Sequence, residues 1–376
     1  MKLEVEGKGT LVYKYCDGTD HKRFGCVIKC GSLKESPTVS GILHMIEHMM
    51  VNDVTQRTSR AGLTAECHGH TDFDHILICA SWRGISESTD KKMVKILREV
   101  LHLNSNSDEI LEKSRREVIE EIVESHERVK TQLASWSGWS DGQIVMHPVG
   151  KAACVEKIAI DDILAYSRQI ENSQMVFFSF NIPSRIVNGI INTNYESVAL
   201  KEEEYIWSVN NPVCYIKGNK ECRYLIGRFK GGRGKTIERA ILAEVLKDRY
   251  SKLLKTDFEV YEKRIDRNCV FLYLVLNSIN EAKIEKITRG VLETEVDEFE
   301  MNNSKTLIKR FIVELNEQGI EENYTAIENK IVNNFLYDED VFFLEDYKNL
   351  IRVIDSIELS EINKMVYELR GKKELC

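Results

Sequence analysis

The chain has few prolines, no C-x-x-C pair and no long apolar run among its 376 residues. Because no stretch of about 18 consecutive apolar residues occurs, we expect no helix that crosses a membrane. The first residues alternate as a strand does and lack the apolar core of a signal peptide. The ten cysteines are scattered and do not form the pattern of a secreted disulfide framework. We therefore expect a cytoplasmic protein in a reducing compartment.

The net charge and the length narrow the class of protein further. A net charge of −8 argues against a nucleic-acid partner. A hydrophobic content of 43% with 30% charged residues is typical of a soluble globular protein. The length exceeds that of one ordinary core and suggests two domains. Cys26 and Cys30 lie in an apolar strand-like run, and we interpret them as buried thiols rather than metal ligands.

Strand pairs and helices follow one another in the same order twice along the chain. The first half is expected to contain strands at 3–15, 23–30, 63–69, 74–82 and 175–180, and helices at 88–102, from Asp108 past Val129, 161–170 and 184–191. The second half is expected to contain strands at 213–216, 223–228, 258–261 and 270–276, and helices at 236–254, 280–297, 299–317, 320–336 and 359–370. We predict an α+β fold with two tandem, structurally related domains, 1–197 and 198–376.

Residues 41–50 (GILHMIEHMM) carry His44, Glu47 and His48 in the order H-x-x-E-H, the inverzincin arrangement. On a helix, His44 and His48 are one turn apart, so both imidazoles project from one face. Two neutral imidazoles form half of a tetrahedral zinc site, and a neighbouring carboxylate can take a proton from a metal-bound water. Ser40 is the expected N-cap. The alternative is a surface helix that carries the motif by chance.

A catalytic zinc site needs a third protein ligand and keeps one position open. The helix that starts at Asp108 is rich in carboxylates, most of which we expect on its solvated surface. These residues are Glu109, Glu112, Glu117, Glu120, Glu121, Glu124 and Glu127. One of them could face the histidine pair.

Residues 31–48 resemble the signature of the insulinase-type (pitrilysin, M16) zinc peptidases. The matching residues are Gly31, Ser32, Glu35, Gly41, His44, Glu47 and His48. Residues 116–122 (REVIEEI) resemble the family segment that carries the third zinc ligand. Aligning the apolar positions places this ligand at Glu121, 73 positions after His48, with Glu124, 76 positions after His48, as the alternative.

The resemblance extends to the supporting segments, with one departure. Residues 147–150 (HPVG) look like the family's His-Pro-Leu-Gly turn. Under the Glu121 alignment, Ser114 occupies the position where the family has an upstream Glu. Glu117 or Glu124 would then supply the carboxylate that orients a ligand.

Residues 65–71 fall where the family has an edge strand beside the zinc, to which substrate peptide adds by backbone hydrogen bonding. This region contains three further histidines, His68, His70 and His75. They could form a second metal site, but we interpret them as pocket-lining or surface residues.

The second half has no H-x-x-E-H motif, and in the family this half is a degenerate copy that helps to close a substrate chamber. It often supplies an Arg and a Tyr from an Arg-x6-Tyr segment. Tyr261 matches the Tyr and could donate to the oxyanion, or it is an ordinary residue of a half-buried strand. The Arg position holds Leu254 without a gap or Lys255 with a one-residue shift. A Lys there would lose bidentate recognition.

The resemblance implies two α/β-sandwich domains of the insulinase-type metallopeptidase fold and a Zn²⁺-dependent endopeptidase that acts on peptides or unfolded segments. His44, His48 and Glu121 would bind zinc, Glu47 would be the general base, and Tyr261 would assist. Two chains would close around the peptide substrate, as a homodimer or as a heterodimer with a second M16-like chain. We expect no nucleic-acid or membrane partner.

Two points of function stay open in the sequence. The alternative to an enzyme is a non-catalytic scaffold or partner subunit of a heterodimeric M16-type peptidase. Small bacterial members of the family remove leader peptides from ribosomally made, modified peptides. Leader-peptide processing would be a role by analogy alone, since nothing in the sequence selects it.

Overall fold

The protein is described here by a computed structural model that covers residues 4–6, 11–15, 18–102, 108–139, 147–191, 215–218, 221–229, 235–266, 269–277, 279–317, 324–337 and 347–371. The chain divides into two compact units, unit 1 with residues 1–126 and 146–203, and unit 2 with residues 127–145 and 204–376. The predicted domain boundary at 197/198 lies outside the described residues. Within the described ranges, no helix combines the length and apolar character needed to span a bilayer.

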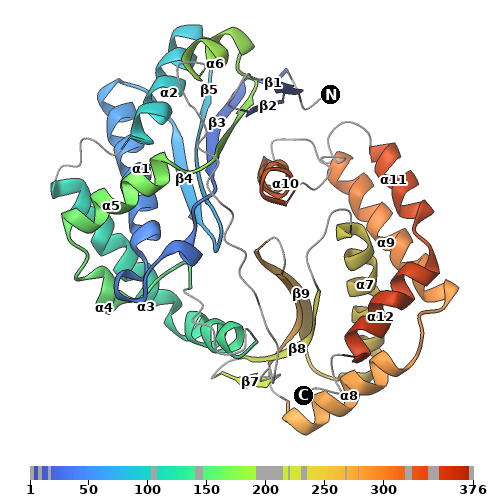
Figure 1. The fold of residues 1–376 in the computed structure, drawn as a ribbon. Helices are drawn as coiled ribbons and strands as arrows, with labels where there is room; N and C mark the ends of the chain where they lie inside the picture. Colours follow the sequence, from blue (N-terminus) through green and yellow to red (C-terminus); the bar gives the residue numbers. More distant parts are fainter. Residues whose placement is uncertain are drawn as a thin grey trace. The chain divides into compact units, whose positions relative to one another are not determined.

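Unit 1 combines one mixed β-sheet with several helices (Figure 1). Its strands are β1 (Glu4–Glu6), β2 (Leu11–Tyr15), β3 (His21–Ile28), β4 (Glu66–Thr71), β5 (Ile76–Arg83) and β6 (Met175–Phe180). Its helices are α1 (Ile42–Arg60), α2 (Glu87–Val100), α3 (Asp108–Trp139, whose residues from Glu127 belong to unit 2), α4 (Ala152–Val155), α5 (Ile160–Glu171) and α6 (Ser184–Ile191). Two short 3-10 turns, η1 (Ser32–Lys34) and η2 (Pro37–Val39), precede α1.

The strand order of this sheet is β1-β2-β6-β3-β5-β4. The β2–β6 pair is parallel, and the other described pairs are antiparallel. The order places β1 and β4 at the two edges of the sheet in the part of the chain that the structure describes. The resemblance to the insulinase-type peptidases implied this edge position for residues 65–71.

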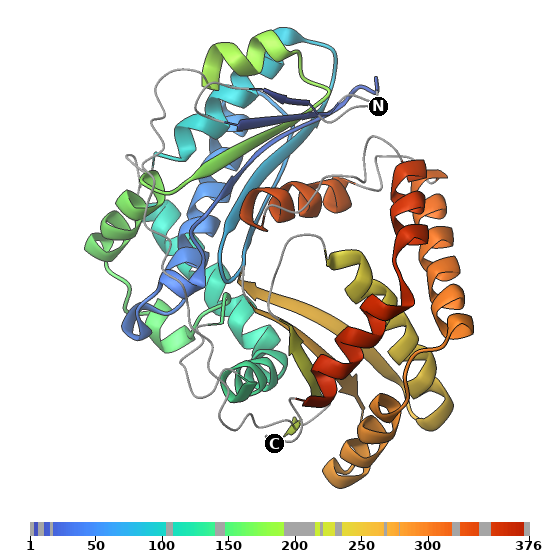
Figure 2. The ribbon, with the colours of Figure 1, turned by 45° about the vertical axis from the view of Figure 1, so that its right-hand side comes forward.

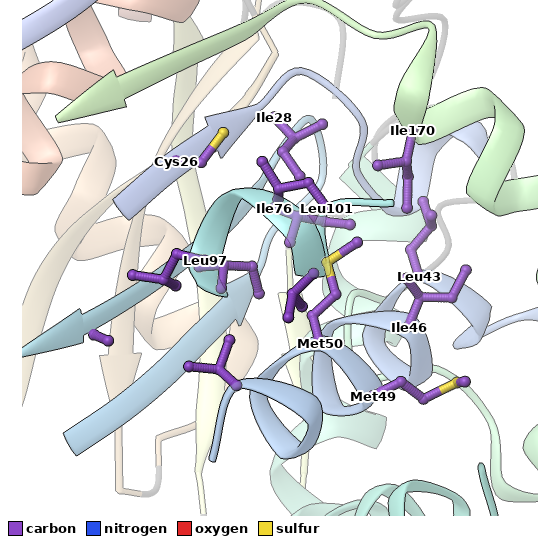
Figure 3. Packing of buried hydrophobic residues seen from close by; sticks show 14 of the residues in the cluster. Cys26, Ile28, Leu43, Ile46, Met49, Met50, Ile76, Leu97, Leu101 and Ile170 are labelled. Atoms are coloured by element: carbon purple, nitrogen blue, oxygen red, sulfur yellow. The ribbon is translucent and has the colours of Figure 1, made fainter. Parts of the chain in front are cut away.

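The core of unit 1 lies between this sheet and its helices. Helices α1 and α2 pack along one face of the sheet (Figure 2). Side chains alternate between the two faces of a strand, so every second residue of β3 and β5 enters this core. Ile46 and Met50 of α1 gather there with Ile76 of β5 (Figure 3). Helix α1 is therefore held against the sheet along most of its length.

A buried ion pair connects the sheet to α2. Lys22 Nζ on β3 lies 2.5 Å from Asp90 Oδ2, and Trp82 Nε1 donates to Asp90 Oδ1 at 3.0 Å. We expect Asp90→Asn to cost about 3–5 kcal/mol, because it leaves the buried ammonium of Lys22 without a counter-charge. Chemical unfolding measures this loss. The control is Glu87→Gln, which removes the exposed pair with Arg185 and should cost about 0–1 kcal/mol; equal losses in the two variants would contradict the prediction.

Unit 2 contains a second sheet with its own helices. Its strands are β7 (Tyr215–Lys217), β8 (Cys222–Phe229), β9 (Phe258–Asp266) and β10 (Cys269–Leu276). Its helices are α7 (Thr236–Leu253), α8 (Glu281–Glu293), α9 (Glu298–Glu317), α10 (Tyr324–Tyr337), α11 (Tyr347–Ser356) and α12 (Leu359–Gly371). The strand order is β7-β8-β10-β9, and each described pair is antiparallel.

The two units repeat one plan. The order β8-α7-β9-β10 in unit 2 matches β3-α1-β4-β5 in unit 1. Within their sheets the corresponding strands also have the same order, β3-β5-β4 and β8-β10-β9. The expected α+β fold with two related halves is confirmed.

The structure differs from the sequence-based expectation in a few elements. Helix α11 was not predicted, although Leu350 and Ile354 lie four residues apart and are both buried, the spacing of one helical face. Strands β4 and β5 begin two or three residues later than expected. Cys26 and Cys30 are free, buried thiols as predicted. Burial raises the pKa of Cys30 to about 12.

Candidate metal centre

Helix α1 begins at Ile42, and its N-cap is Gly41 rather than the predicted Ser40. Gly41 has φ +96°, a left-handed conformation that favours glycine. The carboxylate of Glu35 accepts hydrogen bonds from the amides of Gly41 and Leu43 at 2.8 and 2.9 Å. Burial raises the pKa of Glu35 to about 7, although these two bonds favour its ionised form. The oxygens that cap the helix thus come from Glu35, in an earlier turn. A prediction that considers only the residue directly before the helix misses this cap.

Gly31 and Ser32 attach the segment before α1 to the turn between β4 and β5. The Ser32 amide donates to Asp72 O at 3.0 Å. A Cβ on Gly31 would lie 2.4 Å from the amide nitrogen of His75, so a larger residue would separate the two segments. These signature residues therefore position the entry of α1.

His44, His48 and Glu121, the three residues predicted as metal ligands, lie together. The imidazole centroids of His44 and His48 are 4.8 Å apart. Glu121 Oε2 on α3 lies 3.4 Å from His44 Nε2 and 3.5 Å from His48 Nε2. Glu124, the alternative ligand, is three residues further along α3 and exposed. The structure therefore brings Glu121 to the histidine pair.

The outer nitrogen of each imidazole has its own acceptor. His44 Nδ1 lies 3.2 Å from the carbonyl oxygen of Val149, and His48 Nδ1 lies 3.4 Å from Glu117 Oε2. These partners favour a proton on each Nδ1, so Nε2 is the ring nitrogen that would bind a metal in place of its hydrogen bond to Glu121. Ligands about 2.0–2.1 Å from one tetrahedral ion lie about 3.3–3.4 Å apart, close to the two distances to Glu121. The donor set therefore suits zinc.

Val149 reaches His44 through the predicted turn at residues 147–150. Gly150 packs directly on Gly41, since a Cβ on Gly150 would lie 2.3 Å from Gly41 Cα. His147 Nδ1 accepts a hydrogen bond from the Val149 amide at 3.1 Å, which stabilises the turn. The sequence identified this turn, and the structure adds that its carbonyl holds the ring of His44.

Glu117 is held in place by Asn52. Asn52 Nδ2 donates to Glu117 Oε2 at 2.7 Å and to Ser114 Oγ at 3.0 Å. Burial acts to raise the pKa of Glu117, but the hydrogen bonds from Asn52 and His48 leave it lowered. Glu117 thus lies in the supporting position left open in the sequence. Asn52 was not predicted, although its place four residues after His48 puts it on the same face of α1.

Ionisation in this cluster suits a cation. Hydrogen bonds from His44 and His48 hold the pKa of Glu121 well below its usual range. Burial acts to lower the pKa of His48, but the neighbouring carboxylates leave it raised. Glu121 is therefore charged, as a carboxylate ligand must be, and a metal competes with a proton at His48.

Glu47 lies between the histidine pair and the edge strand β4. Its Oε2 is 3.8 Å from His44 Nε2, and Thr71 Oγ1 donates to it at 3.4 Å. A Cβ on Gly69 would lie 2.2 Å from Glu47 Oε1, so the strand approaches the carboxylate closely only because residue 69 is glycine. Burial raises the pKa of Glu47, although the nearby histidines act against it. Gly69 and Thr71 were not predicted as site residues.

Glu47 could itself be counted among the metal-binding residues. One ligand atom from each of His44, Glu47 and His48 lies within 4.8 Å of the others. Glu121 Oε2 is nevertheless closer to both ring nitrogens than Glu47 is to that of His44. Of the two carboxylates, Glu121 therefore lies nearer to the histidine pair, and Glu47 lies beside it.

Tyr261 lies on β9 in unit 2. The residue is 42% exposed, its ring stacks on Tyr273 at a centroid distance of 5.7 Å, and its hydroxyl donates to Glu259. Leu254, the ungapped position of the family Arg, is buried, whereas Lys255 is exposed. The catalytic role of Tyr261 stays a prediction.

The three further histidines have separate polar neighbours. His68 Nε2 lies 2.8 Å from the Cys79 thiol, and His75 Nδ1 lies 2.8 Å from Asp74 Oδ1. His70 is more exposed and lies 3.9 Å from Asp72 Oδ2. His68 and Cys79 belong to a group whose ligand atoms are close enough to hold a metal, so the interpretation of the three histidines as pocket-lining or surface residues stays a prediction.

The chain is similar to known proteins in part of its sequence and in its fold. Residues 11–135 match the family model described as insulinase (peptidase family M16). No curated protein matches the chain in sequence. The periplasmic protease PqqL from Escherichia coli is similar in structure, with 16% identity and a TM-score of 0.75 over 98% of this chain and 46% of PqqL.

This chain covers most of the length of two further solved structures. The first half of PqqL, solved separately, has 16% identity and a TM-score of 0.74, over 98% of this chain and 90% of that chain. A protease from Helicobacter pylori has 16% identity and a TM-score of 0.69, over 98% of this chain and 96% of that chain. At such identities the likeness shows the fold alone.

The matched segment contains His44, Glu47, His48 and Glu121, so sequence and structure point to the same region. The chain spans less than half of PqqL, the first of these proteins. The predicted resemblance is confirmed: the chain is similar to the insulinase (M16) family in sequence over residues 11–135 and has the fold of M16-like peptidases over nearly its whole length.

Proposed function

We propose that this chain is a zinc-dependent endopeptidase that hydrolyses peptides or unfolded segments. The family match and the fold support a peptidase function in general. The observation that carries the zinc assignment is the approach of His44 Nε2 and His48 Nε2 to one oxygen of Glu121, at 3.4 and 3.5 Å. Both outer ring nitrogens have acceptors, so the inner nitrogens, which bond to Glu121 in the absence of a metal, are the ones that would bind it.

The residues of the site divide the chemistry between them. When bound by His44, His48 and Glu121, a zinc ion polarises the scissile carbonyl and makes a water more acidic. Glu47 takes the proton of the attacking water and then delivers it to the leaving amine. Burial raises its pKa, which makes the carboxylate a stronger proton acceptor than an exposed one. Tyr261 is proposed to donate to the oxyanion.

Strand β4 offers a template for the substrate. It is one of the two edge strands of the described sheet, and its backbone can pair with an extended peptide. Gly69 leaves no side chain between this strand and Glu47. A peptide that adds to β4 would therefore pass close to the general base, which favours short or unfolded substrates over folded proteins.

The Gly69→Ala variant should lose activity while it keeps its zinc. The new methyl group would lie 2.2 Å from Glu47 Oε1 and would displace that carboxylate. We expect kcat to fall about 10²-fold, a loss typical of a catalytic group misplaced by about 1 Å. Turnover of a fluorogenic peptide and zinc content are measured together. Gly189→Ala is the control, because a Cβ there meets no atom within 4 Å; an unchanged kcat in Gly69→Ala would contradict the proposed geometry.

A second candidate function is that of a non-catalytic partner subunit. PqqL is about twice as long as the region that this chain covers, so we propose that two chains associate, as copies or as different M16-like subunits. Incubation with a peptide library, with and without a candidate partner chain, followed by sequencing of the products, tests both functions. A catalytic chain should retain zinc through extensive dialysis and yield cleaved peptides. A chain without zinc and without products under either condition would be a scaffold.

A further inference from the structure

Asn52 forms a polar bridge between α1 and α3 immediately beside the candidate metal centre. Its side chain is 9% exposed, and Ser114, one of its two partners, is fully buried. The amide nitrogen carries two hydrogens, one for Ser114 Oγ at 3.0 Å and one for Glu117 Oε2 at 2.7 Å. Because a carboxylate oxygen can only accept, the presence of Glu117 fixes which way the Asn52 amide faces.

The bridge ends at a metal-binding imidazole. Glu117 Oε2, the oxygen that Asn52 contacts, also lies 3.4 Å from His48 Nδ1. One oxygen therefore serves both groups, and Asn52 sets its position. The outer partner of a ligating histidine holds the ring orientation and raises its basicity, so a displaced Glu117 would weaken His48 as a ligand.

The same bridge also fixes how α3 lies against α1. Ser114, Glu117 and Glu121 lie at i, i+3 and i+7 on α3, so they share one face. Asn52 contacts Ser114, two turns before Glu121, and Glu117, one turn before it. A rotation or a slide of α3 that removed Glu121 from the histidines would have to break these bonds.

We propose that Asn52 is a positioning residue for the metal centre, acting through Glu117 on His48 and through the α1–α3 register on Glu121. The proposal rests on the proposed zinc-dependent function, but it assigns a role to a residue outside the H-x-x-E-H motif. It also explains how this chain can do without the upstream carboxylate, since Ser114, at that position, anchors Asn52.

A double-mutant cycle on zinc affinity tests the proposal. The full-length wild type, Asn52→Ala, Glu117→Ala and the double variant are titrated with zinc against a competing chelator. Circular dichroism of each metal-free protein at the assay temperature ensures that only folded protein is compared. Each single variant should bind zinc about 10–100-fold more weakly, as is typical for loss of an outer partner. The double variant should be no weaker than the weaker single variant.

Two further variants separate positioning from packing. Asn52→Asp keeps the shape but replaces the donor by a carboxylate that repels Glu117, so zinc binding should weaken as in Asn52→Ala. Thr55→Ala removes an exposed side chain of the same helix and should leave zinc affinity unchanged. Additive losses in the cycle, or wild-type affinity in Asn52→Asp, would overturn the role of Asn52 while zinc binding by the wild type still stands. Absence of zinc binding by the wild type would overturn the proposed function and this role together.

Discussion

The Glu47→Gln protein is expected to bind zinc as the wild type does and to cleave peptides about 10²–10⁴-fold more slowly, the range typical of losing a general base. Glutamine has nearly the same shape and can still accept a hydrogen bond from Thr71 Oγ1. It cannot take a proton from the attacking water. The paired readouts are kcat on a fluorogenic peptide and zinc content after dialysis.

Glu120→Gln is the matched control for this experiment. Glu120 is an exposed carboxylate on α3, next to Glu121 in the chain, and its loss should change neither readout. If Glu47→Gln cleaved peptides at the wild-type rate, the assigned mechanism would be wrong. If Glu47→Gln lost its zinc, Glu47 would belong to the ligand set instead.

The second large effect is expected from Glu121→Gln. This variant removes a charged oxygen that lies 3.4 and 3.5 Å from the two ring nitrogens. Loss of a direct ligand should weaken zinc binding by more than the about 10–100-fold typical of an outer partner. The side chain is 47% exposed, so we expect the metal-free variant to fold as the wild type does. Titration against a chelator measures the affinity.

Glu124→Gln is the comparison that decides between the two ligands considered from the sequence. It should retain wild-type zinc affinity, because Glu124 is exposed and Glu121 lies at the histidine pair. The opposite pattern, with zinc lost only in Glu124→Gln, would assign the third ligand to Glu124. Loss in neither variant would leave the histidines with a different third ligand.

Much of the fold could be predicted from hydrophobic periodicity. The boundaries of β6 and α6 agree with the prediction, and the repeated order of strands and helices is confirmed. Helix α11 was missed although Leu350 and Ile354 have helical spacing, because its ten residues are fewer than the window over which such a period is recognised. The cap of α1 was also missed, because Glu35 lies six residues before the amide of Gly41 that it binds.

In the candidate site, too, contacts between neighbours in the sequence could be predicted, whereas contacts between distant residues could not. His44 and His48 are brought together by one helical turn, so their spacing in the sequence was sufficient to predict the pair. Val149, which holds the outer nitrogen of His44, is 105 residues away along the chain. No local pattern indicates that contact.

The sequence by itself determined the histidine pair, the adjacent Glu47, the carboxylate-rich helix and the repeated α+β plan. It left both Glu121 and Glu124 as candidates for the third ligand. The two residues lie three positions apart on one helix, at nearly the same distance along the chain from His48. Only the tertiary structure decided which of them lies beside the histidines. The physical reason is the register of α3 against α1, which the bonds from Asn52 to Ser114 and Glu117 hold in place.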